Sequence, residues 1–231
     1  MSWPRLWTLC ALIALAGCNT IRVVEIRTEP TGAEILVDDQ TVGTSPVTYG
    51  FDFADPDAIY KVTARKEGYV PSRKRVSQLH LDAAAEERDG TEREFVLIKL
   101  DEDESWTRTL PSPCANQWVE IQVDPNLDKK QVWERLVDTV TKYYPDLSNL
   151  DSEGGYISAK PKEKRFSRGP TATVLVRNQF FCSMASPMPL AYKVKIESKI
   201  NENGKWEPFD RVFQEDAPLL ADLQAQLVAQ E

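Results

Sequence analysis

The sequence predicts two folded domains: an all-β sandwich, followed by an α+β domain in which two helices pack on one face of an antiparallel sheet. Residues 23–100 contain short stretches where polar and apolar side chains alternate, separated by turn-forming residues. Residues 114–231 contain similar stretches and two segments with apolar residues at helical spacing. The 231 residues are enough for two small domains, each with its own core.

The first residues of the chain have the pattern of a bacterial export signal. Arg5 supplies a positive charge, and the run that follows, up to Gly17, is uncharged. This run is too short to span a bilayer and is typical of a signal peptide. Residues 15–18, Leu-Ala-Gly-Cys, resemble the lipobox of bacterial lipoproteins. The resemblance implies that residues 1–17 are removed as a lipoprotein signal peptide and that the thiol of Cys18 takes a diacylglycerol.

A lipid on Cys18 would attach the protein to a membrane, with residues 18–22 as a lipidated tether. Asn19 follows this cysteine where, in enterobacterial lipoproteins, an aspartate would favour retention in the inner membrane. We therefore expect a membrane-anchored, palmitate-bearing lipoprotein of the outer membrane that faces the periplasm. The alternative is an ordinary signal peptide that ends in a cysteine by chance.

Two of the four cysteines remain after this processing, because Cys10 leaves with the signal peptide and Cys18 is lipidated. An exported protein meets an oxidising compartment. We therefore favour a disulfide between Cys114 and Cys182, whose long loop would add up to about 4 kcal/mol of stability on the chain-entropy model. The alternative is two separate reduced thiols, with Cys182 as a buried apolar residue.

Residues 23–100 predict short strands joined by tight turns. Val24, Ile26 and Thr28 alternate with charged residues, which is typical of a half-buried strand. The same reasoning predicts further strands at residues 33–37, 60–65 and 95–100. Because no helical period interrupts these strands, they favour a small antiparallel sandwich.

Several short motifs in this region have the order and spacing of the PEGA family. The motifs are Pro30-Thr31-Gly32-Ala33, Ile35 with Val37-Asp38-Asp39, Gly43-Thr44-Ser45-Pro46, Tyr60-Lys61-Val62 and Gly68-Tyr69. Residues 21–100 therefore resemble a PEGA domain, with Thr31 in place of a frequent glutamate and Asp39 in place of a turn glycine. Aspartate tolerates the left-handed conformation better than most residues. The resemblance implies a β-sandwich module of envelope proteins, usually an accessory or binding unit without catalysis.

The sequence does not have the residue patterns of an enzyme. His80 is its only histidine and lies in or beside a polar insertion at residues 79–94, which we expect to be a solvated loop or short helix. A catalytic dyad or a zinc site would have to be built around this one side chain. The chain also has no phosphate-binding glycine loop and no Gly-x-Ser-x-Gly motif. We therefore predict no enzymatic activity, no catalytic residue, no cofactor and no metal.

The acidic and proline-containing residues 101–113 predict a linker before the second domain. Asp128 begins a predicted helix with a capping box, and Pro145 ends it. Asn203-Gly204 predicts a hairpin turn, and Asp216 is expected to cap a final helix. Strands are expected at residues 117–123, 156–159, 171–181, 190–200 and 206–213.

The element order of residues 114–231 is similar to that of the helix-grip domains in the small lipoprotein of the outer-membrane β-barrel assembly machinery. The likeness rests on this order, on a helix that carries Val132-Trp133, and on Gly155-Tyr156-Ile157 after it. It implies a helix-grip-like α+β fold, and such an analogy says more about fold than about function.

A cluster of basic residues lies between two predicted strands. Five cations surround Phe166 within nine residues: Lys160, Lys162, Lys164, Arg165 and Arg168. On a chain of formal net charge −8, this loop could bind an anionic glycan, a lipid headgroup or an acidic partner. The alternative is a solvated hairpin loop. Trp118 and Trp206 are candidates for a sugar platform, with packing at the core as their alternative.

These features together predict a non-enzymatic envelope lipoprotein that acts as an accessory, scaffold or interaction protein at the membrane. The lipid would hold it to the membrane, and an envelope protein or the cell wall would be its partner. The negative net charge argues against nucleic acid as a partner. The alternative function is a glycan- or lipid-binding module of the cell envelope.

Overall fold

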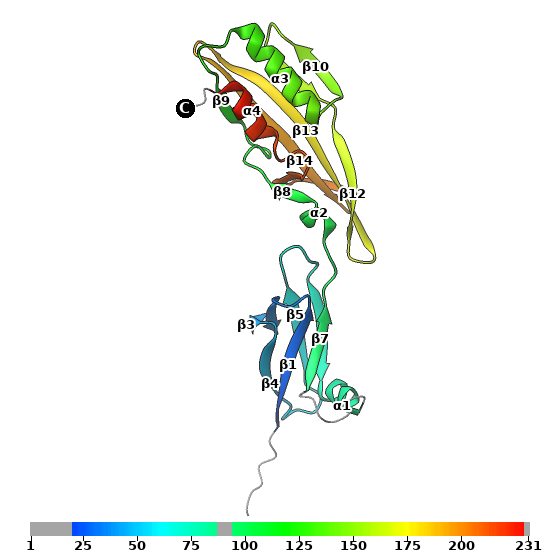
Figure 1. Ribbon diagram of the computed structural model, residues 1–231. Helices are drawn as coiled ribbons and strands as arrows, with labels where there is room; N and C mark the ends of the chain where they lie inside the picture. The colour runs from blue at the N-terminus through cyan, green and yellow to red at the C-terminus, as the bar shows by residue number, and fades with distance from the viewer. Residues whose placement is uncertain (1–19, 87–93, 229–231) are drawn as a thin grey trace, which may run out of the picture. The chain divides into compact units, whose positions relative to one another are not determined.

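The computed structural model describes residues 20–86 and 94–228 (Figure 1). The predicted signal peptide, the lipidation site at Cys18 and part of the predicted insertion, residues 87–93, lie outside the described residues. The chain divides into two compact units, which we call the N-terminal unit (residues 1–64 and 73–98) and the C-terminal unit (residues 65–72 and 99–231). Within the described ranges, no helix is long and apolar enough to cross a membrane.

The N-terminal unit is a sandwich of two β-sheets. Its elements are β1 (Ile21–Glu29), β2 (Glu34–Val37), β3 (Gln40–Thr44), β4 (Val47–Asp52), β5 (Ile59–Arg65), β6 (Ser72–Ser77), α1 (Gln78–Glu86) and β7 (Phe95–Lys99). One sheet has the strand order β4-β1-β7 and the other β3-β2-β5-β6. The all-β fold predicted for this region is confirmed.

The strands of this sandwich follow the alternation seen in the sequence. Val24 and Ile26 of β1 are fully buried, whereas Val23, directly before them, is exposed. The turn between β2 and β3 consists of Asp38 and Asp39, with φ of 48° and 66°. A two-residue hairpin turn of this type needs positive φ at both positions. Asp39 therefore takes up the left-handed conformation for which the family more often uses glycine.

The predicted insertion begins as a short helix, α1, directly after β6. The Ser77 hydroxyl accepts a hydrogen bond from the backbone N of His80 at 3.3 Å, as a helix cap does. The His80 side chain is exposed, and its Nδ1 lies 2.7 Å from the same hydroxyl. Leu81 is buried, so the first turns of α1 pack against the unit.

The C-terminal unit is built around a seven-stranded antiparallel sheet. Its strands are β9 (Val119–Gln122), β10 (Leu147–Asp151), β11 (Tyr156–Ala159), β12 (Lys162–Arg168), β13 (Ala172–Pro187), β14 (Leu190–Glu202) and β15 (Lys205–Pro208). The long strands β13 and β14 form its centre. β11 and β12 pair with β13, whereas β9 and β15 pair with β14.

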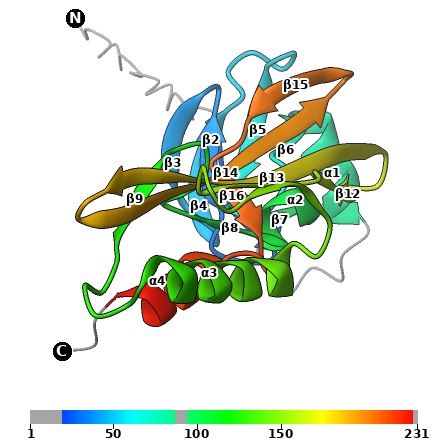
Figure 2. The same cartoon turned by 90° about the horizontal axis from the view of Figure 1, so that it is seen from above.

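Two helices, α3 (Lys129–Tyr143) and α4 (Leu219–Leu227), lie side by side on one face of this sheet (Figure 2). Asp128 caps α3 through the predicted capping box with Gln131. Side chains from both helices and from the facing side of the sheet form one core, which includes Val132, Leu136, Val140, Phe180, Cys182, Val194, Ile196, Leu219 and Leu223. The predicted α+β fold with two helices on one face is therefore confirmed.

The stretch predicted as a linker, residues 101–113, is folded. It contains α2 (Glu104–Thr107) and β8 (Thr109–Pro111), and β8 pairs with β16 (Arg211–Phe213). The buried Arg211 donates to the backbone oxygens of Trp106 and Thr109, and its Cζ lies 3.8 Å from the Trp106 ring centroid. The linker prediction is wrong because this polar stretch has partners about a hundred positions further along the chain.

Two other details of the C-terminal unit differ from the predictions, and one agrees. Residues 206–213, expected as one strand, split into β15 and β16, which pair with different strands. No side chain caps α4, and Asp216 is buried instead. Asn203 and Gly204 form the predicted hairpin turn, with φ of 54° and 85°.

Candidate functional site

The basic segment predicted as a ligand-binding loop is a strand. Lys162–Arg168 forms β12 and pairs residue for residue with β13. Side chains along a strand alternate between the two faces of a sheet. Lys162, Lys164 and Arg168 therefore share a face with the buried Phe166, whereas Arg165 lies on the opposite face.

Lys162 forms an ion pair with a buried carboxylate, that of Asp216. The Lys162 Nζ lies 2.7 Å from Oδ1 of Asp216 and 4.4 Å from the ring centroid of Tyr144. The Tyr144 hydroxyl donates to Oδ2 of Asp216 at 2.7 Å. Burial raises the pKa of Asp216, and these two hydrogen bonds act against that shift. The next basic side chain, Lys164, forms an ion pair with Glu215.

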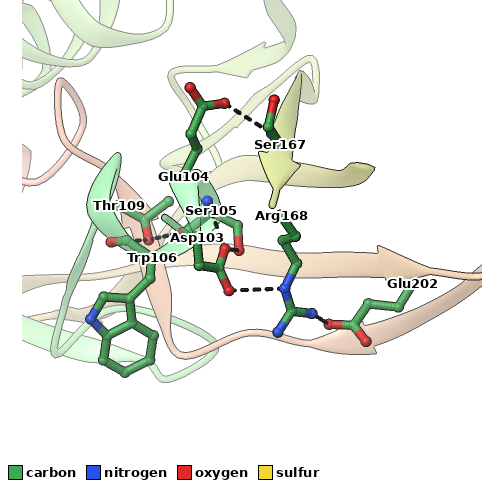
Figure 3. A network of polar contacts seen from close by, with 8 residues as sticks. All are labelled: Asp103, Glu104, Ser105, Trp106, Thr109, Ser167, Arg168 and Glu202. Atoms are coloured by element: carbon green, nitrogen blue, oxygen red, sulfur yellow. Dashed lines mark hydrogen bonds and ion pairs between the residues drawn. The ribbon is translucent and has the colours of Figure 1, made fainter. Parts of the chain in front are cut away.

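Arg168 belongs to a polar network at the end of β12 (Figure 3). Its guanidinium forms ion pairs with Glu202 and with Asp103, where Nε and Oδ2 are 2.8 Å apart. The Asp103 side chain also caps α2. Beside it, Glu104 accepts a hydrogen bond from the backbone N of Ser167 at 2.8 Å. The acidic residues of the expected linker are therefore partners of this basic strand.

The five cations expected to bind one ligand are thus not equivalent. Lys162, Lys164 and Arg168 have carboxylate partners within the C-terminal unit. Lys160 and Arg165 are exposed and form no ion pair with the residues that the structure describes. The segment is a paired strand, which corrects the prediction of a loop.

The helices α3 and α4 lie on one face of the sheet (Figure 2). The strand register places a second group of cations and aromatic rings on the opposite face. We call it the outer face and define it by Trp118, Glu120, Glu163, Arg165, Arg177, Gln179, Phe181, Ser183, Lys193, Lys195, Glu197, Lys199 and Trp206. On β13 and β14 these residues alternate with residues that are buried on the opposite face. All of them are at least partly exposed.

One end of the outer face is centred on Trp118, whose side chain is 45% exposed. The Nζ atoms of Lys193 and Lys195 lie 5.2 and 5.1 Å from the centroid of its ring. Lys195 Nζ is also 5.4 Å from the ring of Phe181, its partner across β13 and β14. In the described residues, neither lysine forms an ion pair. Both ammonium groups lie against aromatic rings, and their acidic neighbours are Glu120, which pairs with Lys193 across the strands, and Glu197, whose pKa the charge of Lys195 helps to lower.

The other end of the outer face holds a second aromatic–cation pair. Arg177 Cζ lies 4.3 Å from the ring centroid of Trp206. Arg177 also forms an ion pair with Glu163, with Nη2 and Oε1 2.5 Å apart. Next to it, a hydrogen bond from Lys199 lowers the pKa of Glu197. Arg177 and Lys199 at this end therefore have ion-pair partners, whereas Arg165 on the same face has none among the described residues.

The predicted disulfide is wrong, because Cys114 and Cys182 are free, buried thiols. Ile196 N donates to Cys114 O at 2.8 Å along one edge of β14, whereas Cys182 pairs with Val194 across the other edge. Two strand spacings amount to about 9.5 Å, more than the Cα separation of about 7 Å that a disulfide can bridge. Desolvation raises the pKa of both thiols, that of Cys182 to about 12.

Sequence reasoning named Trp118 and Trp206 but not the lysines of the outer face. Lys193 and Lys195 alternate with buried residues in a strand that was predicted, and this period of two was the available indication that they share a face. Their position beside Trp118 depends on the register between β9 and β14, which the sequence does not reveal. Among the residues that the structure describes, no group of His, Cys, Asp and Glu could hold a metal ion.

Comparisons with known proteins identify one part of the chain. The model of the PEGA domain matches residues 21–81, which include the motifs from Pro30 to Tyr69. Neither the curated proteins nor the solved structures contain a significant match to the chain. The similarity of the C-terminal unit to helix-grip domains therefore stays a prediction. The match places the resemblance to a PEGA domain at residues 21–81 of this chain.

Proposed function

We propose that this chain is a lipid-anchored protein of the bacterial envelope that acts by binding, as an accessory or scaffold, and not by catalysis. The observation that carries the proposal is the outer face of the C-terminal sheet. Its aromatic and cationic side chains are partly exposed and lie on paired strands. Strands hold binding groups more rigidly than loops do. The outer face is therefore suited to bind a partner without large rearrangement.

The membrane attachment in this proposal rests on the lipobox-like sequence before Cys18, and the PEGA domain supports an envelope location. Cells that express the full chain and grow with labelled palmitate should incorporate the label into it. Cys18→Ala should abolish the label and move the chain from the membrane fraction to the soluble fraction. A wild-type chain without label would contradict the anchor, whichever fraction holds it.

The binding role is tested by crosslinking in living cells that express the full chain, followed by mass spectrometry. We expect one envelope component to be recovered repeatedly with the wild-type chain and to be lost with Cys18→Ala, because anchoring keeps both partners at the same membrane. Recovery of no specific component would contradict the accessory role.

A glycan- or lipid-binding module is the second candidate. The observation that favours it is the two lysine ammonium groups beside the exposed ring of Trp118, which form no ion pair in the described residues. Such a module would also act by binding, so the two candidates differ in the ligand and not in the kind of activity.

A further inference from the structure

We propose that the outer face binds an acidic glycan, a polysaccharide with carboxylate groups, along β13 and β14. This inference rests on the proposed function, since it names the ligand of the face to which we assign binding. It replaces the segment 160–168 as the place where an anionic polymer would bind, because three of the five cations there already have carboxylate partners.

The aromatic side chains of the outer face form two separate clusters. Phe181 and Arg177, which mark the two aromatic clusters on β13, are four residues apart, and four residues of an extended strand span about 13 Å. Trp118 lies beside the first cluster and Trp206 beside the second. Sugar rings pack their C–H faces against aromatic rings, so two clusters at this separation suit two residues of one extended polysaccharide that have at least one other sugar between them.

The cations of the outer face fit a negatively charged polymer. This face of the sheet carries five cations, against the four carboxylates of Glu120, Asp151, Glu163 and Glu197; the cations are Arg165, Arg177, Lys193, Lys195 and Lys199. This excess of positive charge occurs on a chain whose formal net charge is −8. A local basic surface on an acidic protein attracts anionic ligands to that surface in particular. Lys193 and Lys195 are the groups we expect to pair with ligand carboxylates.

The composition of the outer face favours a glycan over a protein or a membrane surface. The core of a protein interface is contiguous and depleted of charged residues, whereas here Phe181 lies between Gln179 and Ser183 on its own strand and faces Lys195 on the next. A membrane-surface element presents an apolar face that inserts between headgroups. Separated rings with amide, hydroxyl and ammonium groups between them match a ligand rich in hydroxyl and carboxylate groups.

The test uses the purified full chain and purified peptidoglycan sacculi, whose stem peptides carry carboxylates, in a co-sedimentation assay. We expect the wild-type chain to sediment with sacculi, and Trp118→Ala and the double variant Lys193→Glu/Lys195→Glu to bind about tenfold more weakly. The matched control is Lys130→Glu/Lys142→Glu, which makes the same charge change on exposed positions of α3 and should bind like the wild type. Converting the carboxylates of the sacculi to neutral amides should weaken binding to a similar extent. Denaturant unfolding of each variant checks that the fold is retained.

Three results would overturn the inference. The first is a wild-type chain that does not sediment with sacculi, and the second is an equal loss of binding in the α3 control. The third is tighter binding to vesicles of phosphatidylglycerol than to sacculi, which would assign the face to a lipid surface. If sacculi are not bound but crosslinking in cells recovers one envelope protein, the glycan inference fails and the proposed binding role stands.

Discussion

The two faces of the C-terminal sheet use the same strands for different purposes. On β13, Phe180 and Cys182 are buried beneath α3 and α4, while Arg177 and Phe181 on the opposite face are partly exposed. The helix-covered face has a large apolar core, and a second, smaller apolar cluster around Val176 and Phe166 lies on the same side of the sheet. The outer face has rings separated by charged and amide side chains. One face of these strands therefore specifies the fold, and the other face is free to bind a ligand.

The largest expected effect on stability comes from alanine substitutions at the two adjacent phenylalanines of β13. Phe180 is 1% exposed and stacks on Tyr144 with ring centroids 5.8 Å apart, so Phe180→Ala should lower the free energy of unfolding by about 3–5 kcal/mol. Phe181→Ala removes a partly exposed ring and should lower it by less than about 1 kcal/mol. Denaturant unfolding measures both, and equal losses would show that the two faces do not differ as described.

The next largest effect on stability is expected at the ion pair between Lys162 of β12 and the buried Asp216. Asp216→Ala removes a fully buried carboxylate from Lys162 and Tyr144 and should cost about 3 kcal/mol, because one charge of a buried pair is left uncompensated. The control is the neighbouring Glu215→Ala, which breaks an ion pair whose two side chains are nearly half exposed and should cost less than about 1 kcal/mol. If Asp216→Ala left the free energy of unfolding unchanged, that result would contradict the conclusion that the cations of β12 help to hold this strand in place.

The smallest expected effect concerns the reactivity of the two buried thiols in the folded and in the unfolded protein. In a full chain with Cys10→Ser and Cys18→Ser, Cys114 and Cys182 are the only cysteines, and both are buried with raised pKa. A thiol reagent reacts with the thiolate, so the folded protein should react slowly at pH 8 and faster only as the pH rises towards 12. Two equivalents should react at once after unfolding without reductant. No reaction after unfolding would mean that the two cysteines are bonded after all.

The sequence predicted the local features of the fold well. Asp128 caps its helix, Asn203 and Gly204 form their turn, and the alternation around Val24 identifies the buried side of β1. Each of these depends on residues within a few positions of one another. The PEGA motifs belong to the same class, because their turns and strand ends are also local.

The features that the sequence did not predict depend on partners far along the chain. Lys162 forms an ion pair with Asp216, which lies 54 positions later in the chain. Arg211 donates a hydrogen bond to Thr109, which lies 102 positions earlier. Without these partners, a run of cations is expected to be a solvated loop and a run of acids a linker. The outer face was missed for the same reason, since the place of Lys195 between Trp118 and Phe181 needs the register of three strands.

The most direct test of the difference between the two faces places a photo-crosslinking amino acid in the full chain in living cells. One variant carries it at Ser183 on the outer face and a matched variant at Asp138, exposed on α3. Both positions face solvent in the C-terminal unit, so the two variants differ in the face that they sample. We expect light-dependent attachment to an envelope component from Ser183 and none from Asp138. Attachment from Asp138 but not from Ser183 would contradict the outer face as the binding surface.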